Sequence, residues 1–545
     1  MLVGIDRPQD DPLASRDTVS SLHRTITWVD AFWVASGSPA LLLFTLGALA
    51  ATVGSPSWAV WVVSIAFGFL QCFTYAEIAG LFPNKSGGAS IYGAIAWVRY
   101  GKLLAPISVW CNWIAWSPVL ALGTGLAAGY IMSMLFAADS VVMSWSFTIA
   151  NLNWIRSGLT LRINANAILA GTIMLGIFAI QHRGILSAAR VQMIFAISSL
   201  LPLILIGIVP IITGDIPLNH FMPFVPLTRD SAGSHVPGSW TMKGVTVIAG
   251  GLFIAGYSTY GFETAVCYTR EFRDPARDTF KAIFFSGLLC LFIFTLVPVA
   301  FQGALGLSGM LEPGIQSGMG VGKAMATMVG ATGLMANFII VMLVMTLLLS
   351  IMTAMAGSSR TLYQGAVDGW LPRYLGRINS HGAPVRAMWT DLVFNLILLM
   401  MSDNIFVLAA SNVAYMIFIF MNLNAGWIHR IDRPDWARPF RAPTWLLATG
   451  GVLGYLNLFI IGMGADIWGP GTLLSGLLLA AIILPVFWWR HYVVDKGIFP
   501  QSMRDDMYLT GVDDPVGDRS AGFLPYIALV AGVVVVAVGH VMARF

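Results

Sequence analysis

Long apolar segments alternate with short polar ones along almost the whole chain. Runs of about 18 or more apolar residues are long enough to cross a bilayer as helices. The pattern predicts an all-α integral membrane protein with twelve transmembrane helices, and a thirteenth helix from about Phe523 to Met542. The twelve predicted spans lie near residues 31–53, 57–82, 103–136, 164–181, 190–213, 244–268, 282–304, 333–356, 387–402, 404–428, 445–467 and 470–489. The residues after the long third span, 137–161, are too apolar for a simple loop.

Two of these spans contain residues that interrupt a helix. Residues 36–40 read Ser-Gly-Ser-Pro-Ala, and residues 250–263 place several glycines among polar residues. A glycine costs about 1 kcal/mol relative to alanine inside a helix. Irregular backbone at membrane depth is tolerated only where protein or a water-filled cavity surrounds it. The two stretches are therefore either surfaces where helices pack closely or, as a matching pair, the sign of a transporter binding site.

Composition and charge agree with a membrane protein. Of the 545 residues, 57% are hydrophobic and 10% are charged, whereas about a quarter is charged in a typical soluble protein. The first residues, up to about 28, are polar and contain no apolar core of a signal peptide. The 4 cysteines lie far apart inside apolar spans and predict neither a disulfide framework nor a metal site.

The distribution of basic residues predicts the orientation. With the N-terminus inside, most of the 30 Lys and Arg residues fall on inner segments. The outer segments hold Arg156, Arg162, Arg229, Lys243 and Lys323. This bias supports twelve spans and predicts a multi-pass protein of the cytoplasmic (inner) membrane with its N-terminus inside.

The spans can be paired as two halves of five, each opening with an interrupted helix. Because five is odd, the second half starts on the opposite side of the membrane, which is an inverted-topology repeat with its site near the midplane. The predicted regions are an N-terminal cytoplasmic tail (1–28), a transport core (29–428), two further helices (429–490), a cytoplasmic segment (491–521) and an extra helix (522–545).

Four motifs follow one another at the predicted helix ends. They are Gly37-Ser38-Pro39; Glu77 with Pro83, Gly87-Gly88 and Tyr92; Gly261-Phe262-Glu263 with Glu271, Asp274-Pro275 and Arg277; and Ser359-Arg360 with Asp368-Gly369, Leu371-Pro372 and Pro384. In this order they resemble the amino acid–polyamine–organocation (APC) superfamily, specifically its amino acid permeases. The resemblance covers roughly residues 28 to 490 and says much less about the substrate than about the family.

The resemblance implies a ten-helix inverted-repeat core, two further helices and alternating access. It also implies that the helix starting at Pro39 presents backbone N–H groups and a positive dipole end to a substrate carboxylate. Pro39 departs from the family's second glycine and lacks a donor, which leaves Ser38, Ala40 and Leu41. The residues expected to hold the substrate are Ser36, Gly37, Ser38, Pro39, Ala40, Leu41, Ala255, Gly256, Tyr257, Ser258, Thr259 and Gly261.

Carbonyl groups of the sixth span are expected to receive the substrate ammonium, near Ala255, Gly256 and Ser258. Tyr257 is a candidate gate. Trp113 and Trp116 of the third span either line the same cavity or belong to the structural core.

Acidic residues inside a membrane span are functional candidates. Glu77, Glu263 and Asp391 lie near the predicted inner ends of their spans. All three are expected to form an inner gate or ion pairs with Arg270, Arg360 or their neighbours, and Glu271 is a further candidate for such a pair. The absence of an acidic residue near the midplane favours neutral substrates, although aromatic side chains could bind a cation instead.

The coupling ion is left open. Proton-coupled relatives carry a lysine in the fifth span, where this chain reads Ile197-Ser198-Ser199-Leu200. Ser350 and Thr353 share a helix face and, with carbonyls near Ala35, form a candidate sodium site. The alternative is that both hydroxyls bond to their own backbone. No cofactor is expected other than Na⁺ or H⁺ as a coupling ion.

The leading hypothesis is a secondary transporter of small neutral amino acids, with the amino acid and membrane lipid as partners. The alternatives are an amine or polyamine transporter or exchanger, and a sensor that binds amino acids without moving them. No nucleophile–base set, phosphate loop or zinc spacing points to an enzyme, and no nucleic acid is expected as a partner. The oligomeric state is left open.

Overall fold

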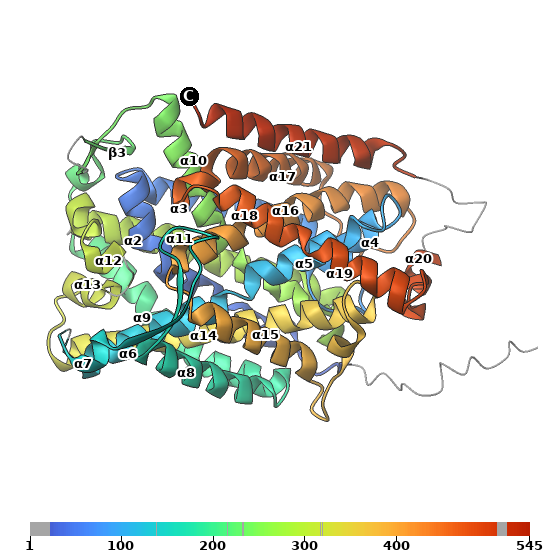
Figure 1. Cartoon of the computed structure of the whole chain (residues 1–545), viewed down its shortest axis with the longest axis horizontal. Helices are drawn as coiled ribbons and strands as arrows, with labels where there is room; N and C mark the ends of the chain where they lie inside the picture. The colour runs from blue at the N-terminus through green and yellow to red at the C-terminus, as the bar shows by residue number, and fades with distance from the viewer. Residues whose placement is uncertain are drawn as a thin grey trace, which may run out of the picture.

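The computed structural model describes residues 22–137, 139–214, 216–230, 234–316, 318, 320–508 and 520–545. It is a bundle of long helices whose axes run in a common direction (Figure 1). Most of the predicted N-terminal tail, residues 1–21, lies outside the described residues, as do residues 509–519 of the predicted cytoplasmic segment.

The first part of the chain forms an interrupted helix, several long helices and two short β-hairpins. Its helices are α1 (Trp28–Ala35), η1 (Ser38–Leu41), α2 (Leu42–Val53), α3 (Ser57–Gly80), α4 (Ala89–Trp97), α5 (Ala105–Trp116), α6 (Val119–Leu135), α7 (Val141–Ser144), α8 (Ala165–Gln181), α9 (Ile185–Thr213) and η2 (Leu218–Phe221). Its strands are β1 (Ser146–Asn151), β2 (Thr160–Asn164), β3 (Leu227–Arg229) and β4 (His235–Pro237), paired antiparallel as β1–β2 and β3–β4.

The second part is helical. Its elements are α10 (Met242–Thr259), η3 (Gly261–Glu271), α11 (Pro275–Met310), α12 (Pro313–Gln316), α13 (Val321–Met328), α14 (Leu334–Val367), η4 (Arg373–Gly376), α15 (Val385–Leu399), α16 (Asn404–Asp432), α17 (Thr444–Gly464), η5 (Ala465–Trp468), α18 (Thr472–Ala481), α19 (Ile483–Trp488), η6 (Trp489–Val494), α20 (Gln501–Tyr508) and α21 (Leu524–Met542). The η elements are 3-10 helices, except η6, which is a π-helix.

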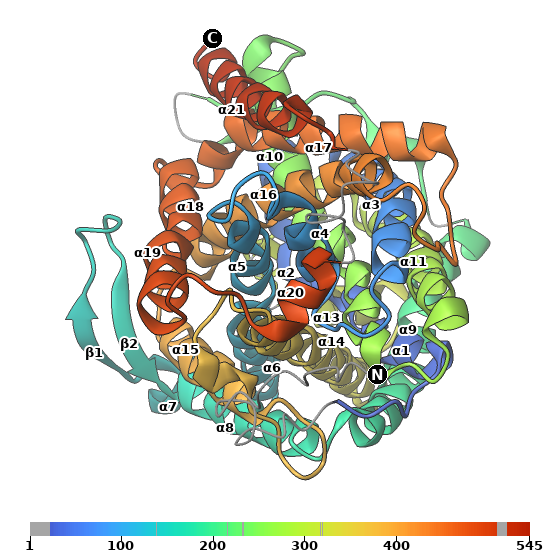
Figure 2. The ribbon, with the colours of Figure 1, turned by 90° about the vertical axis from the view of Figure 1, so that its right-hand side faces the viewer.

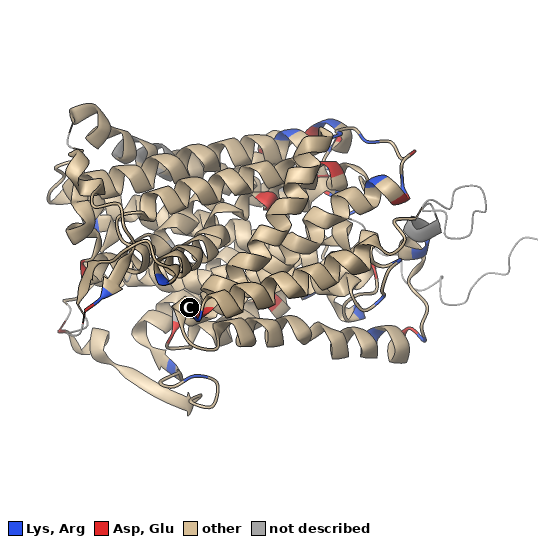
Figure 3. Cartoon of the chain, turned by 90° about the horizontal axis from the view of Figure 1, so that it is seen from above, with Lys and Arg blue, Asp and Glu red and all other residues tan. Residues whose placement is uncertain are grey.

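Among the described residues, 9 helices are long and apolar enough to cross a membrane, and up to 10 if a bent pair counts as one span. The bent pair is the first predicted span, where the helices on the two sides of the interruption meet at 41°. The predicted spans near 164–181, 190–213 and 387–402 fall on α8, α9 and α15. Lys and Arg gather mainly at one end of the bundle (Figure 3).

The sixth predicted span changes geometry near the end of the stretch 250–263. The helix continues through Gly250 and Gly251 to Thr259 and gives way to the 3-10 geometry of η3 only after Tyr260. The glycine pair allows close packing instead. A Cβ on Gly250 would lie 2.9 Å from the Ile467 Cβ, which agrees with the helix-packing alternative.

The third predicted span and the residues after it form several separate elements. α5 and α6 meet at Ser117 and Pro118, so this long span consists of two consecutive helices. The apolar stretch after it forms the short helix α7 and then the β1–β2 hairpin. Figure 2 shows this hairpin beyond the outline of the helices.

The helix near the C-terminal end packs along α17 (Figures 1 and 2). Glycines permit the close approach, since a Cβ on Gly532 would lie 2.9 Å from the Leu458 Cδ1 and one on Gly539 would lie 2.7 Å from the Phe459 carbonyl oxygen. α21 therefore packs closely along α17.

Candidate functional site

The two interrupted stretches lie against each other inside the bundle. The Ser258 hydroxyl donates to the Leu41 carbonyl at 3.2 Å, and the Thr45 and Ser258 hydroxyl oxygens are 3.5 Å apart. A Cβ on Gly261 would lie 3.1 Å from the Leu41 Cδ1 and 2.8 Å from the Trp116 Cη2. The end of α10 thus faces η1 across a distance that only a glycine at position 261 allows.

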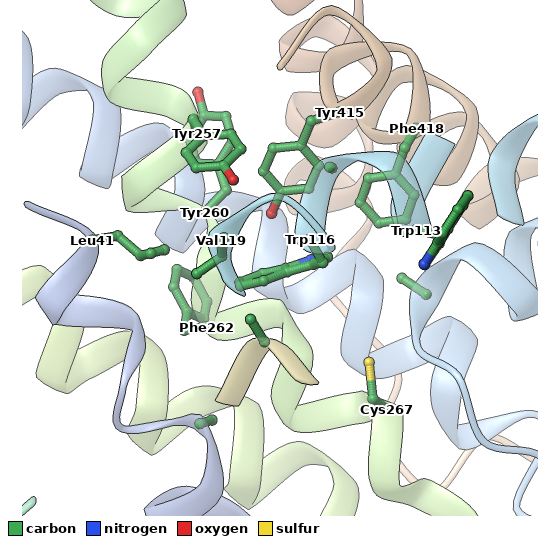
Figure 4. Close-up of a cluster of buried hydrophobic side chains, with 14 of the residues drawn as sticks. Leu41, Trp113, Trp116, Val119, Tyr257, Tyr260, Phe262, Cys267, Tyr415 and Phe418 are labelled. Carbon is green, nitrogen blue, oxygen red and sulfur yellow. The ribbon is translucent and has the colours of Figure 1, made fainter. Parts of the chain in front are cut away.

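Aromatic side chains surround this junction (Figure 4). Tyr415 of α16 lies at its centre, with ring centroids 6.2 Å from Trp116, 6.3 Å from Tyr257 and 6.4 Å from Tyr260. All four side chains are buried. Among the described residues, the Tyr415 hydroxyl has no hydrogen-bond partner. The junction therefore offers aromatic surface and an unused hydroxyl.

Two of the predicted backbone contacts are already engaged. The Ala40 amide donates to the Gly37 carbonyl at 3.1 Å, and the Gly256 carbonyl accepts from the Tyr260 amide at 3.2 Å. In this conformation the Ala40 amide and one lone pair of the Gly256 carbonyl are therefore used within the chain. The reason is that the backbone keeps helical hydrogen bonds almost up to each break.

The side chains of the first interruption bond within their own segment. The Ser36 and Ser38 hydroxyls donate to the carbonyls of Trp33 and Ala35, at 2.6 and 3.0 Å. Pro39 stands at the start of η1, where a proline removes no needed donor.

The remaining predicted residues of the sixth span are buried in α10. Ala255 has no exposed surface, and the Thr259 and Ser64 hydroxyl oxygens are 2.8 Å apart. Thr259 therefore faces α3, whereas Ser258 faces η1.

Trp113 and Trp116 each donate from the indole nitrogen to a buried carboxylate. Trp116 donates to the Glu263 Oε1 at 2.8 Å, and Trp113 donates to the Asp391 Oδ1 at 2.9 Å. Trp116 lies against Gly261 at the junction, whereas Trp113 lies with Phe394 at a centroid distance of 5.0 Å. The structure therefore places only Trp116 at the site.

Glu263 and Asp391 differ from the expectation that they form ion pairs. Glu263 accepts from Trp116 and, at 3.3 Å, from the Asn112 Nδ2, while its Oε2 has no hydrogen-bond partner among the described residues. Asp391 accepts from the Ser117 and Ser358 hydroxyls at 2.5 and 2.6 Å. No cation pairs with either carboxylate in the described part of the chain, because the nearest arginine of the motif, Arg360, is held elsewhere.

Ion pairs instead join the ends of helices. Arg360 holds Glu271 through two hydrogen bonds, 2.5 Å from Nε and 3.1 Å from Nη2. Glu77 accepts from Arg430 at 2.6 Å and from Arg438 at 3.2 Å. All three contacts between a carboxylate and a guanidinium group are largely buried. Through these contacts the residues link α3, η3, α14 and α16 at one end of the bundle.

The chain just before α1 covers the Glu271 end of η3. The backbone amides of Thr25 and Ile26 donate to the Glu271 carbonyl at 3.0 and 3.1 Å, and the Arg273 amide donates to the Ile26 carbonyl at 2.8 Å. This end of the junction is therefore closed in the structure.

The candidate sodium site contains a residue that the sequence did not single out. The Thr353 hydroxyl donates to the Val34 carbonyl at 2.5 Å. The Gln192 amide nitrogen of α9 lies 3.2 Å from the same carbonyl and 3.4 Å from the Thr353 hydroxyl. The Ser350 hydroxyl donates to the Leu347 carbonyl of its own helix at 2.8 Å. A glutamine in an otherwise apolar span was the sequence signal that could have identified Gln192, which is fully buried in the structure.

Comparison with known proteins points to the same family as the sequence motifs. A family model described as amino acid permease matches residues 26–502. An uncharacterised transporter of Legionella pneumophila is 23% identical over 356 residues, 62% of this chain and 65% of the relative. The branched-chain amino acid permease BcaP of Bacillus subtilis is 23% identical over 365 residues, 65% of this chain and 66% of the relative. The human large neutral amino acids transporter small subunit 2 is 24% identical over 394 residues, 70% of this chain and 64% of the relative.

Proposed function

Because the chain belongs to the amino acid permease family, we propose that it is a secondary transporter that moves neutral amino acids across the cytoplasmic membrane by alternating access. The observation that carries the proposal is the direct contact of two interrupted helices, through Ser258 and Leu41, deep inside an apolar bundle. Such paired interruptions are where transporters bind their substrates. Two relatives are named for branched-chain and large neutral amino acids, which supports the neutral class.

The proposed architecture has twelve spans with a five-plus-five inverted repeat, and α21 as a thirteenth. α1–η1–α2 opens the first half and α10–η3 opens the second. We place the N-terminus inside because Lys and Arg are concentrated at one end of the bundle (Figure 3) and basic residues favour the inner side.

The substrate would bind between η1 and the end of α10. The start of a helix carries a partial positive charge and the end of a helix a partial negative one, so the carboxylate would lie toward η1 and the ammonium toward the end of α10. The aromatic faces of Trp116 and Tyr415 would then contact the side chain. Because Leu41 and Gly261 are in contact, binding requires these segments to separate.

The Gln192 side-chain amide supports the proposal that transport does not use a sodium ion bound at Thr353. A sodium ion needs several oxygen ligands, and the oxygens here are the Val34 carbonyl, the Thr353 hydroxyl and the Gln192 Oε1, which is buried without a partner among the described residues. As the Gln192 side chain is oriented here, its amide nitrogen donates toward the Val34 carbonyl and the Thr353 hydroxyl, and an N–H donor cannot coordinate a cation. We therefore favour exchange or facilitated uptake over sodium coupling.

A second candidate function rests on Glu263. Its Oε2 is buried without a partner next to Trp116, and a buried carboxylate gains most from a positively charged partner. An amine substrate would supply one, so this residue favours the amine or polyamine transporter.

Uptake into proteoliposomes tests both candidates. Radiolabelled leucine, phenylalanine, alanine and putrescine are supplied with and without a sodium gradient, and with amino acids preloaded inside. Saturable leucine uptake that needs no sodium supports the first candidate. Uptake of putrescine alone supports the second. Binding without any flux would contradict both and favour the sensor.

A further inference from the structure

The β1–β2 hairpin is the feature of the molecule that the proposed transport site does not use. It lies outside the ring of helices (Figure 2) and projects from the body of the bundle (Figure 3). Its strands run across the direction of the helix axes (Figure 1). Because the helices cross the membrane, strands in this direction lie along the plane of the bilayer.

The hairpin has one apolar and one polar face. Phe147 pairs with Ile163, whereas the next pair is Thr148 with Arg162. Neighbouring pairs in a ribbon point to opposite faces. The register shifts between Thr148 and Ala150, so Ile149 lies in a bulge of β1. Phe147 and Ile149 are 62% and 50% exposed.

Tryptophans stand at both ends of the ribbon. Trp145 precedes β1 and is 46% exposed, and Trp154, in the turn between the strands, is 82% exposed. Tryptophan is enriched where a membrane meets water, because its ring is apolar and its N–H is polar. Contact of this apolar surface with water would be unfavourable.

The ribbon is held in place along β2 and at its turn. Thr160, which pairs with Asn151 next to the turn, exchanges hydrogen bonds with Ser402 at 3.0 Å, and the Arg162 amide donates to the Met400 carbonyl at 2.8 Å. Near the tip, Arg156 pairs with Asp403 at 3.0 Å. The apolar face therefore has a definite orientation relative to the helices.

We propose that the β1–β2 hairpin is a membrane-surface anchor whose apolar face, with Phe147 and Trp154, rests in the interface of the outer leaflet. The lipid surface is continuous with the helix that follows. α8 starts directly after β2 and exposes Ile168 and Leu175 by 56% and 47%, as a lipid-facing helix does. The hydroxyl of Thr148 and the guanidinium of Arg162 face water or lipid headgroups.

Spin labels on single cysteines test this placement in lipid nanodiscs. The labelled variants are Phe147→Cys and Trp154→Cys on the proposed lipid side, with Thr148→Cys as the matched control one residue away. The native cysteines are all buried, and unlabelled wild-type protein carried through the same reaction measures any background. Collision with oxygen, which concentrates in lipid, is compared with collision with a water-soluble nickel chelate.

The expected result is that the labels at 147 and 154 collide more with oxygen and the label at 148 more with nickel. Equal access of nickel to all three labels would place the ribbon in water and overturn the proposal. Protection of the labels at 147 and 154 from both reagents, with magnetic coupling between labels of separate chains, would also overturn it and show that a second copy covers the ribbon. An unfolding midpoint equal to that of wild type confirms that each labelled variant is folded, so the result does not depend on transport.

Discussion

The Ser258 hydroxyl and the Leu41 carbonyl are 3.2 Å apart although 217 positions separate them in the chain. Their hydrogen bond joins the end of α10 to η1, close to the interruptions of both helices. Movement of one half of the core against the other has to break or shift this contact. The predictions below start from this junction.

Replacing Gly261 by leucine is expected to reduce leucine uptake by at least about tenfold, since overpacking a filled site costs about 1–3 kcal/mol. The new side chain would overlap Trp116 and Leu41. Initial uptake rates in proteoliposomes measure the effect. Gly451→Ala is the matched control, because a Cβ there meets no atom within 4 Å. Equal rates for the two variants would show that substrate does not pass this junction.

Replacing Glu263 by glutamine separates the two candidate functions. The amide oxygen of glutamine can still accept from Trp116 and Asn112, so uptake of a neutral amino acid should change by less than about threefold, given that one such bond contributes about 1 kcal/mol. Uptake of putrescine should be lost if the carboxylate binds it. Parallel uptake of both substrates by wild type and Glu263→Gln gives the answer, and loss of leucine uptake in the glutamine variant would contradict the neutral-substrate proposal.

Removing Arg360 is expected to destabilise the protein strongly. Arg360→Ala leaves the Glu271 carboxylate buried without a counter-charge, which costs about 3–5 kcal/mol. A large fall in the thermal unfolding midpoint in detergent is the expected readout. Arg277→Ala is the control, because the Arg277–Asp274 pair is 81% and 51% exposed and contributes only about 0–1 kcal/mol. Similar midpoints for both variants would show that the buried pair contributes little to stability.

Replacing sodium by choline should leave the uptake rate of wild type unchanged, because the Gln192 amide already donates toward Val34 and Thr353. Gln192→Leu removes this donor and should lower the unfolding free energy by about 1–3 kcal/mol. Ser198→Ala on the same helix is the control, since the Ser198 hydroxyl is exposed and bonds only to its own helix at Ile194. A sodium-dependent rate in wild type would contradict the proposed sodium-independent transport.

The sequence was sufficient for the class of fold and for the first interruption. Long apolar runs specify transmembrane helices almost without reference to tertiary structure, and proline with neighbouring glycine and serine interrupts a helix by local geometry. The structure accordingly interrupts the first span between Ala35 and Ser38.

Other features depend on partners that are distant in the chain. The sequence did not show where within residues 250–263 the helix changes geometry; it does so after Tyr260, whereas Gly250 and Gly251 serve contacts with Ile467 and Val53. Arg360 pairs with Glu271 and not with Glu263 because of where the folded chain places the two carboxylates. Local sequence does not contain this information.

The tight fit of α21 against α17 has a consequence for biosynthesis. α17 is made well before α21, because α18, α19 and α20 lie between them in the chain. In the proposed architecture, where α21 is a thirteenth span, the α17 surface around Gly462, Leu458 and Phe459 faces lipid until α21 is inserted. The nascent protein then passes through a less compact stage. Assembly of the bundle is therefore completed by a helix that enters the membrane late, and a stalled chain without α21 should be a preferred target of membrane proteases.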